Sequence, residues 1–275
     1  MLLREVEYAR PQTVEEAIRL LAARDGARAL AGGQTLINVM KARAASPDVL
    51  VDLQDLDELR GVVETGQGGL EIGSMTTYSD LISDEAAGAR TILGEVGGMI
   101  ADVQVRNRGT IGGNACSNDP TNHFPPLLVA MNAEFTIVGT DGERTVSADD
   151  FFLGVYMTAA GPGELLTRIT IPPGGQDGFA AVTIGRDGTG IVTAAASLNG
   201  GARVAIGCVG ATPVRATAME QRIGADFSDE NVRAAAEGLG ETLDPPTDVH
   251  ASSEYRKRVA EVLAVRAVLQ AKARR

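Results

Sequence analysis

Two segments with paired glycines constrain this sequence more than any other feature. They read Ala31-Gly32-Gly33-Gln34-Thr35 and Thr110-Ile111-Gly112-Gly113-Asn114, and each precedes an apolar or helical stretch. Paired glycines let backbone N–H groups come close to phosphate oxygens, and an adjacent helix N-terminus adds a favourable dipole. Two such turns could hold one pyrophosphate group. The alternative is that the glycines only form tight turns.

The side chains around these glycines favour a phosphate site made of neutral donors. Hydroxyl and amide groups that can donate hydrogen bonds are present on Thr35, Thr110, Ser117, Gln34 and Asn114, so no lysine is required. Neither segment has the GxxxxGKS/T spacing of a P-loop, and no GxGxxG follows a predicted strand. P-loop and Rossmann folds are therefore disfavoured.

Composition excludes several other classes. The net charge is −11, which is the opposite of a nucleic-acid-binding surface. No run approaches the roughly 18 apolar residues of a membrane span, and the N-terminus lacks a signal-peptide pattern, so we expect a cytoplasmic protein without an integral membrane segment. Cys116 and Cys208 form no CxxC pair, and His123 and His250 are the only histidines. We therefore expect no metal ligands, no cluster ligands and no catalytic residue.

The pattern of apolar residues predicts an α+β protein in three parts. Residues 1–57 read as a β-α-β-α-β unit, with Thr13 and Glu16 at capping-box spacing before a short helix and a second helix expected over 35–45. Residues 58–173 combine a hairpin at 59–74 with helices, including one over 89–103, and further strands, up to a Pro-Pro-Gly-Gly linker. Residues 174–275 predict a three-stranded sheet with two helices.

The sequence motifs around both glycine segments resemble those of the flavoprotein (medium) subunit of molybdenum hydroxylases, as found in bacterial carbon monoxide dehydrogenase and its relatives. The resemblance rests on Leu36-Ile37 with Met40-Lys41-Ala42-Arg43 after the first segment, and on Asp119-Pro120 after the second. Shorter motifs similar to those of that family occur along the whole chain. The resemblance implies an FAD-binding fold of the vanillyl-alcohol-oxidase (PCMH) type, made of two α+β subdomains, followed by a C-terminal domain.

The resemblance also implies which residues bind the cofactor, with both glycine pairs as backbone donors. Around the pyrophosphate it places Ala31, Gly32, Gly33, Gln34, Thr35, Leu36, Ile37, Thr110, Ile111, Gly112, Gly113 and Asn114. It places Ile100, Ala101 and Ser117 near the cofactor, and Leu165 or Leu166 beside the isoalloxazine ring. FAD is expected to be non-covalent. Cys116 is expected to be a small buried side chain and not a nucleophile.

Three positions depart from the pattern of that family. His123 stands where many relatives have Asp or Glu; it contacts the flavin or, alternatively, is a surface histidine that caps the following helix. Thr183 stands where many relatives have Lys, and Ile191 replaces an aromatic residue in a segment that could pack beside the flavin. A cation near the ring raises the flavin potential, so the missing lysine bears on the potential and the acceptor and not on FAD binding.

The function implied is an electron-transfer subunit. Substrate would be oxidised at a molybdopterin centre on a large subunit, and electrons would pass through [2Fe-2S] clusters on a small subunit to FAD and then to a quinone, NAD or oxygen, in a dimer of heterotrimers. One alternative is a free-standing FAD-dependent oxidoreductase, disfavoured by a short C-terminal domain with few His and Tyr residues. Another is an assembly protein that has lost flavin, disfavoured by the intact glycine segments.

Overall fold

Short strands and helices alternate at the start of the chain, as the sequence predicts. The computed structural model describes residues 3–185 and 188–274. Thr13 accepts a hydrogen bond from the Glu16 N–H and so begins the first helix. The strands pair in parallel in the order β1-β3-β2, with β3 fully buried in the middle. The elements are β1 (Glu7–Ala9), α1 (Val14–Ala22), β2 (Ala27–Leu30), α2 (Leu36–Lys41), β3 (Val49–Asp52) and a 3-10 turn η1 (Asp57–Leu59).

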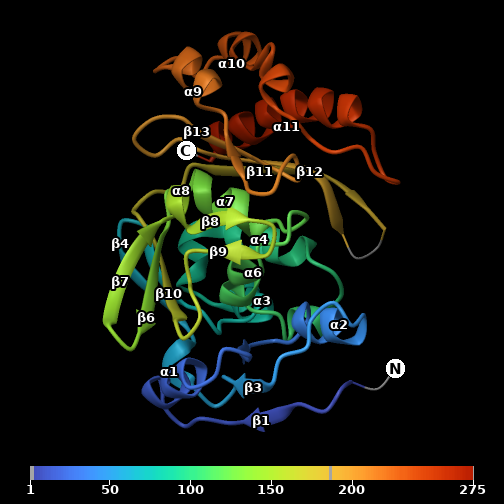
Figure 1. Cartoon of the computed structure of the whole chain (residues 1–275). Coiled ribbons are helices and arrows are strands. Elements are labelled where there is room, and N and C mark those ends of the chain that lie inside the picture. Colours follow the sequence, from blue (N-terminus) through green and yellow to red (C-terminus); the bar gives the residue numbers. More distant parts are fainter. Residues whose placement is uncertain (1–2, 186–187, 275) are drawn as a thin grey trace.

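The middle of the chain forms an antiparallel sheet with helices gathered on one side of it (Figure 1). The strand order is β4-β5-β10-β6-β7, and stacked Phe135 and Phe151 rings fill the core behind it. The strands are β4 (Val62–Gly66), β5 (Gly69–Gly73), β6 (Glu134–Gly139), β7 (Gly142–Ser147) and β10 (Leu165–Ile171), with a separate hairpin of β8 (Phe152–Gly154) and β9 (Met157–Thr158). The helices are α3 (Tyr78–Ser83), η2 (Ala87–Arg90), α4 (Thr91–Met99), α5 (Val103–Arg106), α6 (Ile111–Ser117), α7 (Phe124–Ala130) and α8 (Ala148–Phe151).

A second antiparallel sheet carries the C-terminal helices. The three expected strands are present, and a short fourth strand and one more helix than expected complete this part. The long last helix packs directly on the sheet: a Cβ at Gly178 would lie 2.0 Å from the Ala267 carbonyl oxygen. The elements are β11 (Asp177–Ile184), β12 (Thr189–Ser197), β13 (Arg203–Gly207), β14 (Val214–Arg215), α9 (Thr217–Ile223), α10 (Asp229–Ala236), η3 (Leu239–Thr242) and α11 (Ser253–Ala273).

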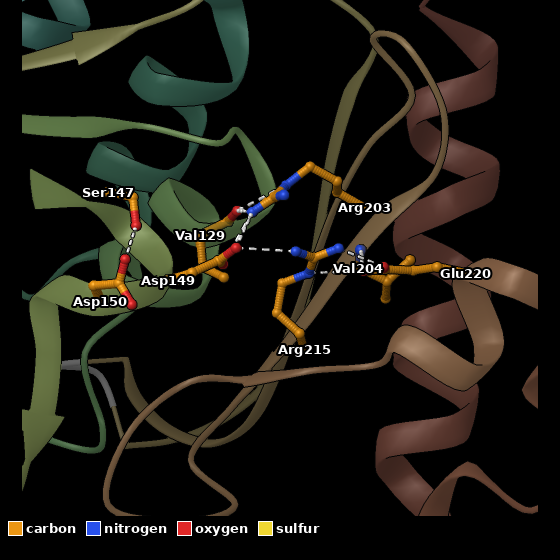
Figure 2. A network of polar contacts seen from close by, with 8 residues as sticks. All are labelled: Val129, Ser147, Asp149, Asp150, Arg203, Val204, Arg215 and Glu220. Atoms are coloured by element: carbon orange, nitrogen blue, oxygen red, sulfur yellow. Dashed lines mark hydrogen bonds and ion pairs between the residues drawn. The ribbon is translucent and has the colours of Figure 1, made fainter.

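Ion pairs fasten this C-terminal sheet to the middle of the molecule. Figure 2 shows Asp149 of α8 lying against Arg203 of β13 and Arg215 of β14, at 3.0 Å from each. Behind the linker, the buried Arg90 side chain pairs with Asp177 at 2.6 Å and also donates to the Pro172 carbonyl at 2.7 Å. Within the described ranges, no helix has the length and apolarity needed to cross a membrane.

Candidate FAD site

The first glycine segment is a turn whose backbone donors are free. It connects β2 to α2, and Gly33 has φ +72°, a left-handed conformation that favours glycine. In residues 3–185 and 188–274, no hydrogen bond uses the N–H groups of residues 32, 33, 34 and 35. The Gln34 side-chain amide donates to the Gly32 carbonyl at 3.1 Å, which holds the turn in shape. The turn therefore presents four successive N–H groups that can bind an anion.

The second glycine segment is a helix and not a turn. Thr110 is the N-cap of α6, and its hydroxyl accepts from the Gly113 N–H at 3.0 Å. The N–H groups of Ile111 and Gly112 donate to the carbonyls of Thr76 and Ser74, and that of Asn114 donates to the Thr110 carbonyl. The expectation that Gly112 and Gly113 act as free backbone donors is therefore corrected, because all four N–H groups already have protein partners.

Glycine in these segments permits close packing of backbone on backbone. A Cβ at Gly32 would lie 1.9 Å from the Arg108 carbonyl oxygen, and one at Gly112 would lie 2.5 Å from the Ser74 carbonyl oxygen. A Cβ at Gly113 would lie 3.6 Å from the Ala31 Cβ. The first turn thus lies directly against the chain that enters α6. The two glycine segments are therefore in contact, and their sharing of one pyrophosphate group stays a prediction.

A cavity of about 260 Å³ opens beside the first turn. Two cations border it, Lys41 at the end of α2 and Arg108 just before the second glycine segment. The Arg108 guanidinium donates to the Gln54 side chain at 3.1 Å. No acidic residue is part of the lining, which consists of Leu30, Ala31, Gly32, Gly33, Gln34, Ile37, Asn38, Lys41, Gln54 and Arg108. Free N–H donors and two cations without a carboxylate suit a pyrophosphate group.

Sequence reasoning missed both cations and the polar residues Asn38 and Gln54. It expected neutral donors only, because Lys41 and Arg108 are far apart in the sequence and come together only when the glycine segments meet. A sequence signal for Lys41 does exist, since Lys41 belongs to the Met40-to-Arg43 segment that follows the first turn. That segment contributes to the family resemblance, but nothing in it alone indicates that Lys41 borders the site.

A buried polar network continues from α6 into the next loop. The Asn114 side chain donates to the Tyr78 hydroxyl at 2.9 Å, while its own Oδ1 is buried without a partner. Ser117 donates to the Asn114 carbonyl, and the Asn122 amide donates to both. A buried oxygen without a hydrogen-bond partner costs free energy. Asn114 Oδ1 is therefore a position at which a donor group of a bound ligand would complete the network.

His123 is a buried ring and not a surface cap. It is 3% exposed, its ring centroid lies 5.6 Å from that of Phe179, and it makes no capping hydrogen bond to α7. Burial lowers the pKa of the imidazole, because a charged ring would lose its hydration there. Its Nε2 atom is buried without a partner. The surface-cap alternative is therefore wrong, and contact with the flavin stays a prediction.

The other predicted positions, those of the second glycine segment included, are not part of the lining of the cavity beside the first turn. Leu165 and Leu166 of β10 are buried in two different cores. Ala101 has φ +45°, and its carbonyl and that of Ile100 accept from Arg106. Thr183 is exposed on β11. A Cβ at Gly188, just before β12, would lie 2.5 Å from the Met99 carbonyl oxygen.

Ile191 does not offer a face to a cofactor. Its side chain belongs to the core of the C-terminal part, and its carbonyl accepts from the buried Arg256 guanidinium. The expectation that its segment packs beside the flavin therefore finds no support in these contacts. The roles proposed for Leu165, Leu166, Ile100, Ala101 and Thr183 at the flavin stay predictions.

Comparison with known proteins assigns the two halves of this architecture. The family described as "FAD binding domain in molybdopterin dehydrogenase" matches residues 4–174, and the "CO dehydrogenase flavoprotein C-terminal domain" matches residues 179–271. The chain belongs to the FAD-binding medium subunits of molybdenum hydroxylases. The carbon monoxide dehydrogenase medium chain of Afipia carboxidovorans is 40% identical, over 98% of this chain and 97% of that protein.

Solved structures agree with this assignment to the medium-subunit family. Carbon monoxide dehydrogenase from Hydrogenophaga pseudoflava, in a form that lacks the Mo-pyranopterin moiety, matches with a TM-score of 0.93 and 37% identity over 100% of this chain and 99% of that chain. Quinoline 2-oxidoreductase from Pseudomonas putida 86 matches with a TM-score of 0.92 and 32% identity over 99% of each chain. The FAD-binding fold expected from the sequence is therefore confirmed.

The cavity beside the first turn yields a prediction about charge. Replacing the exposed Lys41 with glutamine is expected to weaken FAD binding by roughly 3- to 10-fold at low salt, because one cation facing the phosphates is lost. The loss should shrink as salt rises. Fluorescence titration of the apoprotein with FAD measures it. Lys257→Gln, on α11 and outside the cavity lining, is the matched control, and an equal effect of both variants would contradict a role for Lys41.

Proposed function

We propose that this chain is the flavin subunit of a heterotrimeric molybdenum hydroxylase. It receives electrons from [2Fe-2S] clusters on a small subunit, after a large molybdopterin subunit has oxidised the organic substrate, and it delivers them to an external acceptor. The observation that carries the proposal is the first glycine turn, which borders one cavity with four free N–H groups and two cations and lies against the chain that enters α6. This site suits the pyrophosphate of FAD.

The work of this chain is to bind and orient the flavin. FAD, when bound, supplies the redox chemistry, and the protein supplies position and electrostatics. The first turn holds the phosphates through backbone N–H groups, while α6 forms the wall behind it. Among the described residues, no group of three or more His, Cys, Asp or Glu side chains could hold a metal. The proposal therefore assigns the molybdenum and iron–sulfur chemistry to partner subunits.

The relatives support a role inside an assembly. Their names describe subunits or chains of larger enzymes, as in the xanthine dehydrogenase FAD-binding subunit of Escherichia coli O157:H7, which is 28% identical over 96% of this chain and 95% of that protein. A dimer of heterotrimers and a cytoplasmic location stay predictions. So does the division of the chain into residues 1–57, 58–173 and 174–275.

The test compares the FAD-loaded chain alone with the chain co-expressed with a cysteine-rich small subunit and a molybdopterin subunit. Aromatic N-heterocycles, aldehydes and carbon monoxide are supplied with an artificial electron acceptor. We expect turnover only with both partners and with molybdenum in the medium. Turnover of an alcohol or carbonyl substrate by the lone chain would instead support the free-standing flavoenzyme.

The mode of FAD attachment gives a separate prediction. Burial raises the pKa of both Cys116 and Cys208 to about 12, which disfavours the thiolate that would form a flavin–cysteine bond. Acid precipitation of the FAD-loaded protein should therefore release all yellow colour into the supernatant. Flavin that stays in the washed pellet would show a covalent bond and contradict this prediction.

A further inference from the structure

A second and larger cavity lies at the joint between the middle of the molecule and the C-terminal sheet. Its volume is about 670 Å³, which is within the usual range of small-molecule sites. It shares no lining residue with the cavity beside the first turn. The lining consists of Gln67, Arg90, Ala130, Met131, Asn132, Pro172, Pro173, Gly174, Gln176, Ser197, Leu198, Asn199, Gly200 and Arg203.

The charge of this lining stands out against that of the chain. The protein has 36 acidic and 25 basic residues, yet the lining contains two arginines and no Asp or Glu. The carboxylates that pair with these arginines, Asp177 and Asp149, are not part of the lining. Arg203 can be followed in Figure 2, where Asp149 engages one end of its guanidinium. The lining therefore contains two cationic side chains and no carboxylate.

Each guanidinium keeps one nitrogen free. Arg90 uses Nε and Nη1 for hydrogen bonds, and Arg203 uses Nε and Nη2. Arg90 Nη2 and Arg203 Nη1 have no hydrogen-bond partner in the described part of the chain. Neither atom is completely buried. The Arg90 side chain is only 1% exposed, so it offers a small part of its surface to the cavity that it lines.

Free amides complement the two guanidinium groups. The side chains of Asn132 and Gln176 line the cavity, and neither takes part in a hydrogen bond among the described residues. Apolar surface from Met131, Pro173 and Leu198 covers the rest. Guanidinium and amide donors match the oxygens of carboxylates and phosphates, and the apolar wall suits an organic body.

We propose that this cavity is a second ligand site, which binds a small organic oxyanion, a carboxylate or a phosphate ester, through Arg90 and Arg203. The lining comes from both sides of the Pro172–Gly174 linker, since Arg90 and Asn132 belong to the middle part and Arg203 to the C-terminal sheet. The ligand thus bridges the two parts. Its binding raises the stability of the folded protein, because the unfolded chain has no such site.

The test uses FAD-loaded protein, so that the donors of the first turn are occupied. Thermal unfolding and titration calorimetry are carried out with citrate, inorganic phosphate and 5′-AMP, with sodium chloride at matched ionic strength and glycerol as controls. We expect a saturable rise in Tm with at least one oxyanion. The three ligands distinguish a carboxylate site from a phosphate site. A rise that sodium chloride reproduces, or no rise with any of the three, would overturn the proposal.

Variants locate the effect. Asn132 has φ +54°, so Asn132→Gly removes its amide at a position that accepts glycine. The double variant Asn132→Gly with Gln176→Ala is expected to weaken binding about tenfold or more. The single variant Arg203→Lys is expected to have the same effect. Arg168→Gln, which removes an exposed charge paired with Glu71 outside the cavity, should leave binding unchanged. Equal affinity in the cavity variants and in Arg168→Gln would also overturn the proposal.

Discussion

Gly32→Ala is expected to lower the affinity for FAD by roughly 100-fold or more. The added Cβ would lie 1.9 Å from the Arg108 carbonyl oxygen and 2.9 Å from the Gly109 Cα, so the first turn and the chain that enters α6 must separate. Both atoms belong to the backbone and cannot rotate away. Separation would displace the four free N–H groups from the cavity. The flavin content of the purified protein and titration of the apoprotein measure the loss.

The matched control is Gly98→Ala in α4. Its Cβ would meet nothing within 4 Å, and alanine has a higher helix propensity than glycine. Circular dichroism of both variants separates lost binding from lost folding. If Gly32→Ala folds and binds FAD with the affinity of the parent, the contact between the two glycine segments does not shape the site, and the assignment of this cavity to the phosphates fails.

Asp177→Asn is expected to lower the free energy of unfolding by about 3–5 kcal/mol. Asp177 and Arg90 form an ion pair at 2.6 Å with both side chains 1% exposed, and the substitution leaves the Arg90 guanidinium buried without its carboxylate. Asn199 donates to the other oxygen of Asp177 at 3.3 Å and also holds the linker through the Gly175 N–H. Urea unfolding, followed by circular dichroism, measures the change.

An exposed ion pair is the control for this substitution. Glu71 and Arg168 lie 3.5 Å apart on the middle sheet, and both side chains are more than 40% exposed. Glu71→Gln should therefore cost less than about 1 kcal/mol, since solvent screens such pairs. A loss for Asp177→Asn that is no larger than the loss for Glu71→Gln would show that the buried pair does not hold the joint together.

Local signals explain why the first part of the fold could be predicted. Thr13 with Glu16 marks the start of α1, and the apolar run at Val49–Asp52 marks the central strand. Helix ends were harder to predict. The helices expected over 35–45 and 89–103 end at Lys41 and Met99, close to residues with left-handed backbone, Arg43 at φ +64° and Ala101 at φ +45°. Such conformations leave no clear mark at non-glycine residues.

The second glycine segment shows where sequence reasoning was misled. Glycine pairs are typical of turns, yet residues 111–117 form α6. The Thr110 hydroxyl caps the Gly113 N–H, and the carbonyls of Thr76 and Ser74 accept from the first two N–H groups of the helix. Those acceptors are far away in the sequence. The same holds for Lys41 and Arg108, which meet only through the tertiary fold. The sequence thus predicted the first turn, but it did not predict the cations beside the turn or the helical form of the second segment.

The proposed electron transfer is tested most directly by mixing substrate anaerobically with the FAD-loaded protein and following the absorbance of the flavin. In the complete complex, we expect substrate to bleach the flavin. The lone chain should show no bleaching, and the complex that carries Gly32→Ala should reduce its clusters without passing electrons to the acceptor. Bleaching of the flavin in the lone chain by the same substrate would contradict the account.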